Sequence, residues 1–157
     1  MKHDRYRVGI DVPGDIRRLL LESYPPQLPN VRARTITWAY DVPADYRFDQ
    51  SRHRVQVLGL YRSPGVEAFK VRFNRMSRGS KSWPFQADQQ SLLHITVAIA
   101  DGVAAADARA ELQAALQDRK RLEDVYLPGT HYVPSWYGRL QMFPLWDTSR
   151  IGTGHAA

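Results

Sequence analysis

One short segment with hydroxyl and imidazole side chains occurs twice in this chain. The segment Thr35–Val42 (TITWAYDV) reappears as His94–Val103 (HITVAIADGV). Side chains alternate across a β-strand, so each copy is predicted to have one small, polar face and one large, apolar face. The polar faces would carry Thr35, Thr37 and Ala39 in the first copy and His94, Thr96 and Ala98 in the second, opposite Ile36, Trp38, Tyr40, Ile95, Val97 and Ile99.

The second copy places an imidazole two residues from a hydroxyl. Imidazole is the side chain best suited to exchange protons near neutral pH, and a hydroxyl on the same face of a strand can donate to a phosphate oxygen. His94 and Thr96 are therefore a candidate phosphate-handling pair, and two such strands side by side would form a groove with a polar floor. The alternative is a histidine that is satisfied at the surface of a sheet, since an isolated H-x-T pattern has low specificity.

The elements that must position these residues alternate along the chain. Strands are predicted over Tyr6–Val12, Arg54–Tyr61, Val66–Phe73, Trp136–Phe143 and both copies of the repeat, and helices over Asp15–Tyr24 and Ala104–Arg119. Arg62–Gly65 has the composition of a hairpin turn, and Asn74–Gln90 is a long polar segment of the kind that is usually functional or mobile. This order predicts an α+β fold of two similar lobes, with mostly antiparallel sheets around a central cleft and helices outside.

Length and composition limit the possible classes of protein. A chain of 157 residues is predicted to form a single domain over 1–146, followed by a flexible tail at 147–157. The chain has no cysteine, no glycine-rich phosphate loop and no metal-ligand cluster of histidines and carboxylates, so we expect neither a metal nor a cofactor. The first residues are too polar for a signal peptide, and no apolar run approaches the ~20 residues that span a bilayer. We therefore expect a soluble, cytoplasmic protein that does not contact a membrane.

Basic residues are concentrated in one part of the chain. The net charge is +6, whereas the stretch from Arg52 to Lys81 contains eight basic residues and one acidic residue. Such a zone attracts phosphorylated ligands or polyanions, although a solvated hairpin face would have the same composition. Aromatic residues interleaved with cations suit stacking on a nucleobase. The candidate ligand-binding residues are Arg72, Arg75, Trp83, Phe85 and Tyr132.

The residues around His94 resemble a known family. Leu93–Val97 (LHITV) resembles the second signature of the two-histidine (2H) phosphoesterases, and Arg34–Trp38 (RTITW) stands where the first signature belongs. The intervening segment is similar to a subset of that superfamily linked to RNA repair and cyclic-nucleotide cleavage, so that the resemblance covers roughly Val31 to Val103. It implies a two-lobed α+β fold in which two H-x-[ST] motifs face each other across a cleft. One histidine acts as general base and the other as general acid, the hydroxyls hold the phosphate oxygens, and no metal is required.

The first motif departs from the family pattern because Thr35 stands at the position of its histidine. A hydroxyl does not titrate usefully near pH 7, and loss of one acid–base partner typically costs ~10²–10⁴-fold in rate. The resemblance implies that His94 is the proton carrier, that Thr37 and Thr96 orient phosphate, and that Thr35 is the altered fourth position. His53 and His131 could also reach the groove after folding, but a surface histidine is the more common outcome for each.

Three functions are compatible with these residues. The sequence favours a metal-independent phosphodiesterase that acts on RNA 2′,3′-cyclic phosphate ends or on a cyclic (oligo)nucleotide. A catalytically degenerate protein could instead bind a nucleotide or RNA in the same groove. A third alternative is an interaction module whose basic hairpin contacts an acidic protein. A nucleotide or an RNA end is the expected ligand, and the sequence does not define an oligomeric state.

Overall fold

Alternation of apolar and polar residues produces strands along much of the chain, as that period predicts. The computed structural model describes residues 5–75 and 93–145, the side chain of Arg75 excepted. The strands are β1 Arg5–Asp11, β2 Asn30–Val31, β3 Thr35–Pro43, β4 His53–Arg62, β5 Val66–Arg75, β6 His94–Ile99, β7 Ser135–Gly138 and β8 Gln141–Pro144. The helices are α1 Gly14–Ser23, α3 Ala105–Ala115 and the 3₁₀ helix η2 Arg119–Arg121. The predicted tail at 147–157 and most of the predicted loop Asn74–Gln90 lie outside the described residues.

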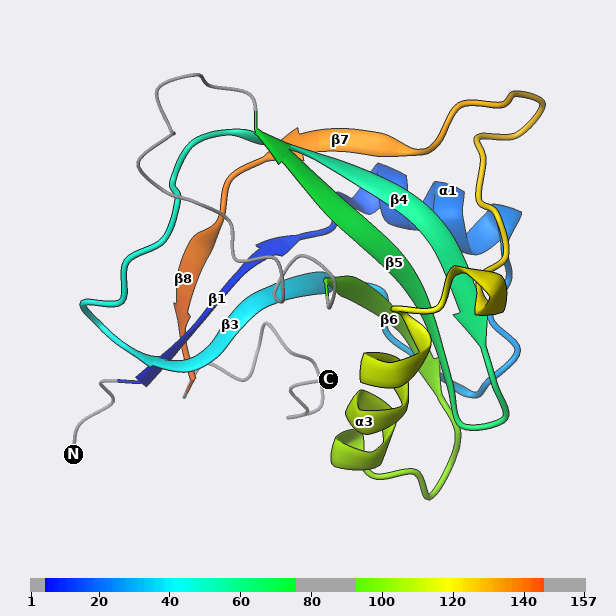
Figure 1. Cartoon of the computed structure of the whole chain (residues 1–157), viewed down its shortest axis with the longest axis horizontal. Coiled ribbons are helices and arrows are strands. Elements are labelled where there is room, and N and C mark those ends of the chain that lie inside the picture. The colour runs from blue at the N-terminus through cyan, green and yellow to red at the C-terminus, as the bar shows by residue number, and fades with distance from the viewer. Residues whose placement is uncertain (1–4, 76–92, 146–157) are drawn as a thin grey trace.

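The described strands form one curled antiparallel sheet (Figure 1). Its order is β7-β4-β5-β6-β3-β1-β8, and β2 pairs separately with β6. The predicted α+β class is confirmed, and the strands are antiparallel as expected. The sheet is nevertheless continuous, whereas the sequence predicted a sheet for each of two lobes. The two copies of the repeat are joined because β3 pairs directly with β6, with Ile36 opposite Ile95.

The predicted strand Trp136–Phe143 is two short strands at opposite edges of the sheet. β7 pairs with β4 and β8 pairs with β1, while Arg139 and Leu140 alone separate the two strands. Ile10 of β1 reaches across to β7, because a Cβ atom added at Gly138 would lie 2.3 Å from its Cδ1 atom. One continuous segment therefore ties both edges together and holds the curl of the sheet (Figure 1).

Each face of the sheet packs against a different helix. On β5, Phe69 belongs to the main core together with Leu20 of α1, whereas its neighbour Ala68 packs with Leu112 of α3. Because adjacent residues of a strand point to opposite faces, α1 and α3 lie on opposite sides of the sheet. The face that packs on α3 also carries His94. Lys70 pairs directly with His94, and it points to the same face as Ala68 because the two are two residues apart on β5.

Helix α3 is shorter than the predicted helix Ala104–Arg119. It ends at Ala115, and the extended residue Asp118 then begins η2 by accepting a hydrogen bond from the backbone N–H of Lys120 at 3.1 Å. The side-chain cap competes with continuation of the helix, as Asp commonly does. None of the helices in the described ranges has the length and apolar character that crossing a bilayer requires.

Both copies of the repeat contain a β-bulge at the same position. Val8 and Gly9 of β1 pair with Ala39 and Thr37, which leaves Trp38 unpaired, and Glu67 and Ala68 of β5 pair with Ala98 and Thr96, which leaves Val97 unpaired. An extra residue shifts the alternation of the strand beyond it. The predicted faces are therefore correct before each bulge and wrong after it: Ala98 joins the main core and Ile99 joins the α3 cluster.

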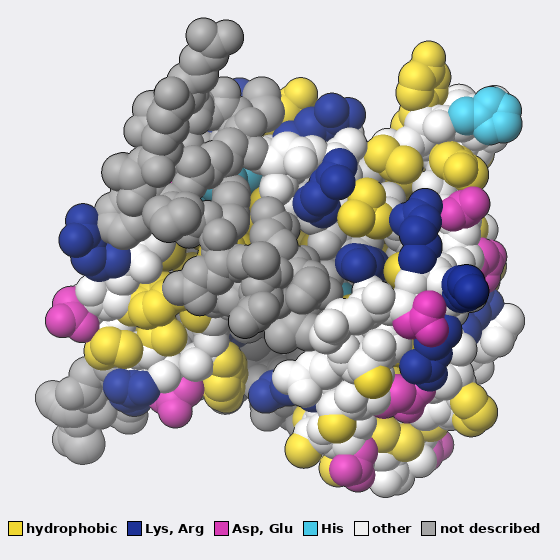
Figure 2. Space-filling model, in the orientation of Figure 1, with side chains coloured by type: hydrophobic (Ala, Val, Ile, Leu, Met, Phe, Trp, Pro, Cys, Tyr) yellow, Lys and Arg dark blue, Asp and Glu magenta, His cyan; other side chains and the backbone are white. Residues whose placement is uncertain are grey.

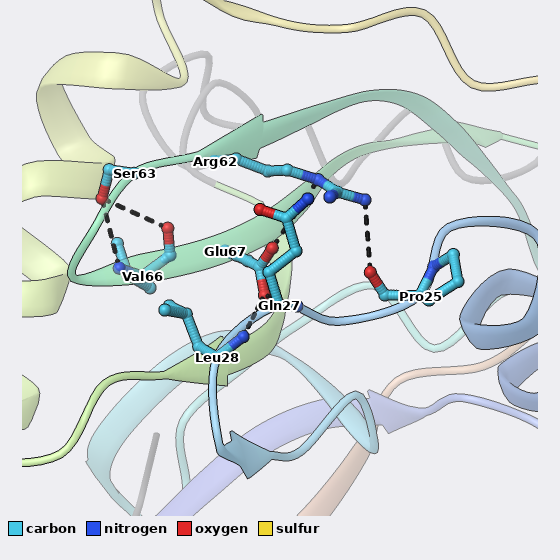
Figure 3. Close-up of polar contacts among 7 residues, drawn as sticks. All are labelled: Pro25, Gln27, Leu28, Arg62, Ser63, Val66 and Glu67. Atoms are coloured by element: carbon cyan, nitrogen blue, oxygen red, sulfur yellow. Dashed lines mark hydrogen bonds and ion pairs between the residues drawn. The ribbon is translucent and has the colours of Figure 1, made fainter.

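A buried carboxylate fixes the loop that leads from α1 back to the sheet. Figure 3 shows Glu67 of β5 between the loop and Arg62 of β4. Its Oε1 atom accepts from the backbone N–H groups of Gln27 at 2.9 Å and Leu28 at 3.2 Å. Its Oε2 atom lies 3.6 Å from Nε of Arg62. Burial of a charge is tolerated when it is paired and hydrogen-bonded in this way, so Glu67 anchors the loop rather than forming part of a site.

Candidate functional site

The pairing of the two repeat copies places their polar side chains beside one another. Ile36 and Ile95 face each other and are buried in the main core, so the residues that flank them point to the opposite face of the sheet. A cavity of about 200 Å³ opens on that face (between the paired strands and α3). Its lining includes Thr35, Thr37, His94 and Thr96, the four positions singled out from the sequence.

The space for this cavity results from the way β3 and β6 pair. Ile36 and Ile95 are the one pair of partners that these two strands share. Before β3, the backbone N–H groups of Arg32 and Ala33 bind the carbonyls of Val97 and Thr96 at 2.7 and 2.8 Å. Ala33 has a φ of 62°, a left-handed conformation that turns the chain before Thr35. The two strands are thus held at one point and separate beyond it.

Helix α3 forms the second wall of the cavity. Its buried stripe of Ala108, Leu112 and Ala115 packs on the sheet, and the exposed residues Arg109 and Gln113, four positions apart, line the cavity beside that stripe. The guanidinium of Arg109 lies 6.0 Å from the ring centre of Tyr40, which lines the opposite side. A second cavity of about 20 Å³ shares His94, Thr96 and Arg109 with the first.

The electrostatics of the cavity favour an anion. Among the lining residues that the structure describes, Arg109 is the one permanently charged side chain, and Tyr40, Gln113 and the threonines are neutral donors. Lys70, which pairs with His94, donates to the carbonyl of Leu116 at 2.7 Å. Burial, and to a lesser extent the charge of Arg119, lowers the pKa of Lys70. Asp11 pairs with Thr35 from β1 and is the carboxylate in register with the motif.

Arg72 and Tyr132, the predicted ligand-binding residues whose side chains the structure describes, do not line this cavity. Arg72 lies on the same face of the sheet, two residues from Lys70, and donates to Oε1 of Gln56 at 3.0 Å. Tyr132 is 74% exposed in the connection before β7 and is not a lining residue. Trp83, Phe85 and the side chain of Arg75 lie outside the described residues.

The two alternative histidines are also elsewhere. His53 is buried, which corrects the surface position expected for it: its ring stacks on Phe73 at 5.7 Å, and its Nε2 atom lies 3.9 Å from Oδ1 of Asp49. His131 is exposed, as expected, with its ring edge-on to Tyr126. His94 is therefore the histidine that lines the cavity within the described part of the chain.

Sequence reasoning missed Arg109, Gln113 and the polar-side position of Tyr40. Arg109 is the single basic residue of the alanine-rich helix α3, which is a signal that the sequence contained. The position of Tyr40 follows from the bulge at Trp38, which precedes it in the strand and shifts the alternation by one residue. That bulge has no marker in the segment itself.

A metal centre is not apparent in the parts of the chain that the structure describes, where no three His, Cys, Asp or Glu side chains come together. The described lining therefore offers hydroxyls, one imidazole and one guanidinium, a set that can hold a phosphate and transfer a proton. Comparison with models of known protein families, with curated proteins and with solved structures found no match to this chain.

Proposed function

We propose that this protein is a metal-independent phosphodiesterase that acts on RNA ends with a 2′,3′-cyclic phosphate or on a cyclic oligonucleotide. The observation that carries the proposal is a cavity that both repeat motifs line together, with Thr35 and Thr37 from β3 and His94 and Thr96 from β6. The equivalent bulges in the two copies support an approximate twofold relation between the halves, as in a 2H-like fold. The resemblance of Leu93–Val97 to a 2H signature points to the same chemistry.

The size of the cavity favours a ligand that is only partly enclosed. About 200 Å³ is below the ~300–1,000 Å³ typical of pockets that bury a whole drug-sized ligand. A cyclic phosphate and its ribose need less space than a complete dinucleotide, so the rest of the ligand would lie outside. This arrangement suits the end of a longer molecule.

Five of the lining residues have a role in this proposal. The hydroxyls of Thr37 and Thr96 donate to the two non-bridging phosphate oxygens, and the Arg109 guanidinium neutralises their charge from the side of α3. His94 removes a proton from the attacking water as the new P–O bond forms and the bond from phosphorus to one ribose oxygen breaks. Thr35 cannot supply a proton to that ribose oxygen, so solvent does, and the product is a phosphomonoester. The proposal therefore includes a slow reaction relative to an enzyme with two histidines.

A specific observation favours the second candidate function, which is binding without turnover. Thr35 stands where the resemblance to the 2H signature implies a histidine, and the described cavity lining includes hydroxyls, His94 and a cation. A protein that had lost the reaction could retain this lining to bind a nucleotide phosphate. Such a protein would differ from the first candidate in rate but not in ligand.

Turnover of nucleoside 2′,3′-cyclic phosphates and cyclic dinucleotides, followed by ³¹P NMR in the presence of EDTA, tests the proposal. We expect His94→Ala to reduce the rate ~10²–10⁴-fold, and the matched control His131→Ala, which changes an exposed histidine outside the cavity, to leave it unchanged. Equal rates for wild type and His94→Ala would remove His94 from the mechanism. Saturable binding that Thr96→Val abolishes, without turnover, would instead support the binding protein.

A further inference from the structure

Four cations lie in a row on the same face of the sheet as the cavity. Lys70 and Arg72 are on β5, Arg54 is on β4, and Arg52 immediately precedes β4. The register of the strands places them on one face, because Lys70 pairs with His94, Arg72 with Gln56, and Arg54 with both Asn74 and Tyr137. We call these four cations, together with Tyr137, the basic strip.

The contacts of the side chains confirm that the strip is one surface. Arg72 and Asn74 both donate to Oε1 of Gln56, and Arg54 approaches Oγ of Ser135 at 3.4 Å. The guanidinium of Arg52 lies 4.8 Å from the ring centre of Tyr137. Figure 2 shows Lys and Arg side chains gathered over β4, β5 and η2.

The cations of the strip have neutral partners. Within the described residues, the ion pairs of surface arginines are Arg5 with Asp41, Arg62 with Glu67 and Arg119 with Asp124, and none involves the strip. The nearby helix η2 is different, since Arg119 is paired with Asp124 and Arg121 lies over the ring of Tyr61. A row of like charges without carboxylates is costly unless an anionic partner is close to it, at least part of the time.

We infer that the basic strip binds the nucleotides that precede the cyclic phosphate end of a single-stranded RNA. The inference rests on the proposed function for the cyclic phosphate at the end of the RNA. The binding surface itself is argued from separate observations. Neighbouring strands are ~4.8 Å apart, so the path from His94 across β5 and β4 to β7 spans roughly 14 Å before the offset along the strands is added. Cations along that path meet successive phosphates, and Tyr137, which is 48% exposed, offers a ring for one base to stack on.

The arrangement favours a nucleic acid strand over an acidic protein. Acidic side chains would be satisfied by the cations alone, whereas the strip also contains an exposed aromatic ring beside Arg52 and the amide groups of Gln56 and Asn74. Cations interleaved with an aromatic ring and amides are typical of surfaces that bind single strands with little sequence preference. The position of the strip, continuous with His94 through Lys70, connects it to the cavity where the end of the strand would react.

Fluorescence anisotropy with labelled oligoadenylates of two and eight nucleotides, each ending in a 2′,3′-cyclic phosphate, tests the inference. We expect the octamer to bind at least tenfold more tightly than the dimer at 50 mM salt. Neutralisation of three to four phosphates gives a slope of about −2 to −3 for log K against log salt, and Arg54→Gln or Arg72→Gln reduces that slope by about 0.7. The matched control Arg18→Gln removes the same charge from an exposed position on α1, across the sheet, and leaves the slope unchanged.

Tyr137→Ala separates a nucleic acid from other polyanions. Loss of one stacked base weakens binding of the octamer about fivefold, whereas binding of polyglutamate is unaffected. The inference is overturned if dimer and octamer bind equally, if Arg18→Gln acts like Arg72→Gln, or if polyglutamate binds as tightly as the octamer. Turnover of the dimer without any effect of length would overturn the strip and leave the proposed function standing. Length-dependent binding that His94→Ala does not alter and that leads to no cleavage would support the strip and reject the phosphodiesterase.

Discussion

The two halves of the site differ at the position that could exchange a proton. Thr35 and His94 occupy equivalent places in the repeat, and both line the cavity. Their partners on the neighbouring strands differ as well, since Thr35 pairs with Asp11 of β1 and His94 pairs with Lys70 of β5. An imidazole at position 35 would therefore lie beside a carboxylate, which can orient the ring through a hydrogen bond.

On the proposed phosphodiesterase mechanism, an imidazole introduced at position 35 is expected to increase turnover. In Thr35→His, the new side chain can protonate the leaving ribose oxygen while His94 activates water, and a positioned proton carrier is worth ~10²–10⁴-fold. The rate of hydrolysis of a nucleoside 2′,3′-cyclic phosphate measures the effect. Thr35→Asn, which fills similar space without a titratable group, is the control. If both variants are no faster than wild type, the absence of a histidine at position 35 does not limit the reaction.

At the scale of the elements, the cavity depends on how α3 is attached to the sheet. The phenol of Tyr61 on β4 donates to Oε2 of Glu111 at 2.5 Å, and Arg121 donates to the phenolic oxygen at 3.1 Å. About one turn further along, at the C-terminal end of the helix, Lys70 donates to the carbonyl of Leu116. These contacts fix the wall that carries Arg109, so their loss would widen the cavity without changing its lining.

Alkaline pH is expected to loosen this attachment through Tyr61. Burial, followed by the hydrogen bond and the charge of Glu111, raises the pKa of Tyr61 above its ordinary value of 10.0. The folded state thus retains the phenolic proton more strongly than the unfolded chain. The resulting stability is complete below pH 10 and is lost as the pH rises through the folded-state pKa. The free energy of unfolding in urea, measured between pH 8 and pH 11, should fall less steeply in Tyr61→Phe than in wild type.

The control for this prediction is Tyr132→Phe, which changes a tyrosine that is 74% exposed and should retain the wild-type dependence on pH. At neutral pH, Tyr61→Phe should also cost about 2 kcal/mol, because it removes the hydrogen bonds to Glu111 and from Arg121, which are both charged groups. An identical alkaline slope in Tyr61→Phe and wild type would show that this phenol does not link α3 to the sheet.

The elements and the motif residues were predictable from the sequence, but their pairing was not. Alternation located β4 and β5, and residue type with spacing located His94 and Thr96. The bulges at Trp38 and Val97 arise from the register of β1 and β5, which lie elsewhere in the chain, so the repeat alone carries no sign of them. Arg109 joins the site because α3 docks on the same face as His94, and that contact is tertiary.

At the scale of the whole molecule, the two edges of the sheet are connected by one short segment. The sequence predicted a single strand over Trp136–Phe143 there. Leu140 is buried in the main core between β7 and β8. At Leu140 the chain passes from one edge of the sheet to the other. The segment Ser135–Pro144 therefore connects β4 at one edge with β1 at the other and holds the sheet in its curled shape.

Truncation of Leu140, the buried residue between β7 and β8, is expected to destabilise both edge strands of the sheet. Leu140→Ala deletes a side chain that is 4% exposed, and such truncations cost ~2–5 kcal/mol. Val31→Ala, which shortens a side chain that is 43% exposed on β2, is the control and should change the free energy of unfolding by less than about 0.5 kcal/mol. Urea unfolding measures both effects.

Hydrogen exchange locates the weakened part of the molecule. Because Leu140 holds β7 against β4 and β8 against β1, exchange of backbone amides in Leu140→Ala should accelerate in both pairs and less in β5 and β6 at the centre of the sheet. Acceleration confined to β7 and β4 would mean that β8 is held by other contacts, such as the cation of Arg7 over the ring of Phe143 at 4.5 Å. In that case the curl would depend on each edge separately and not on the segment that joins them.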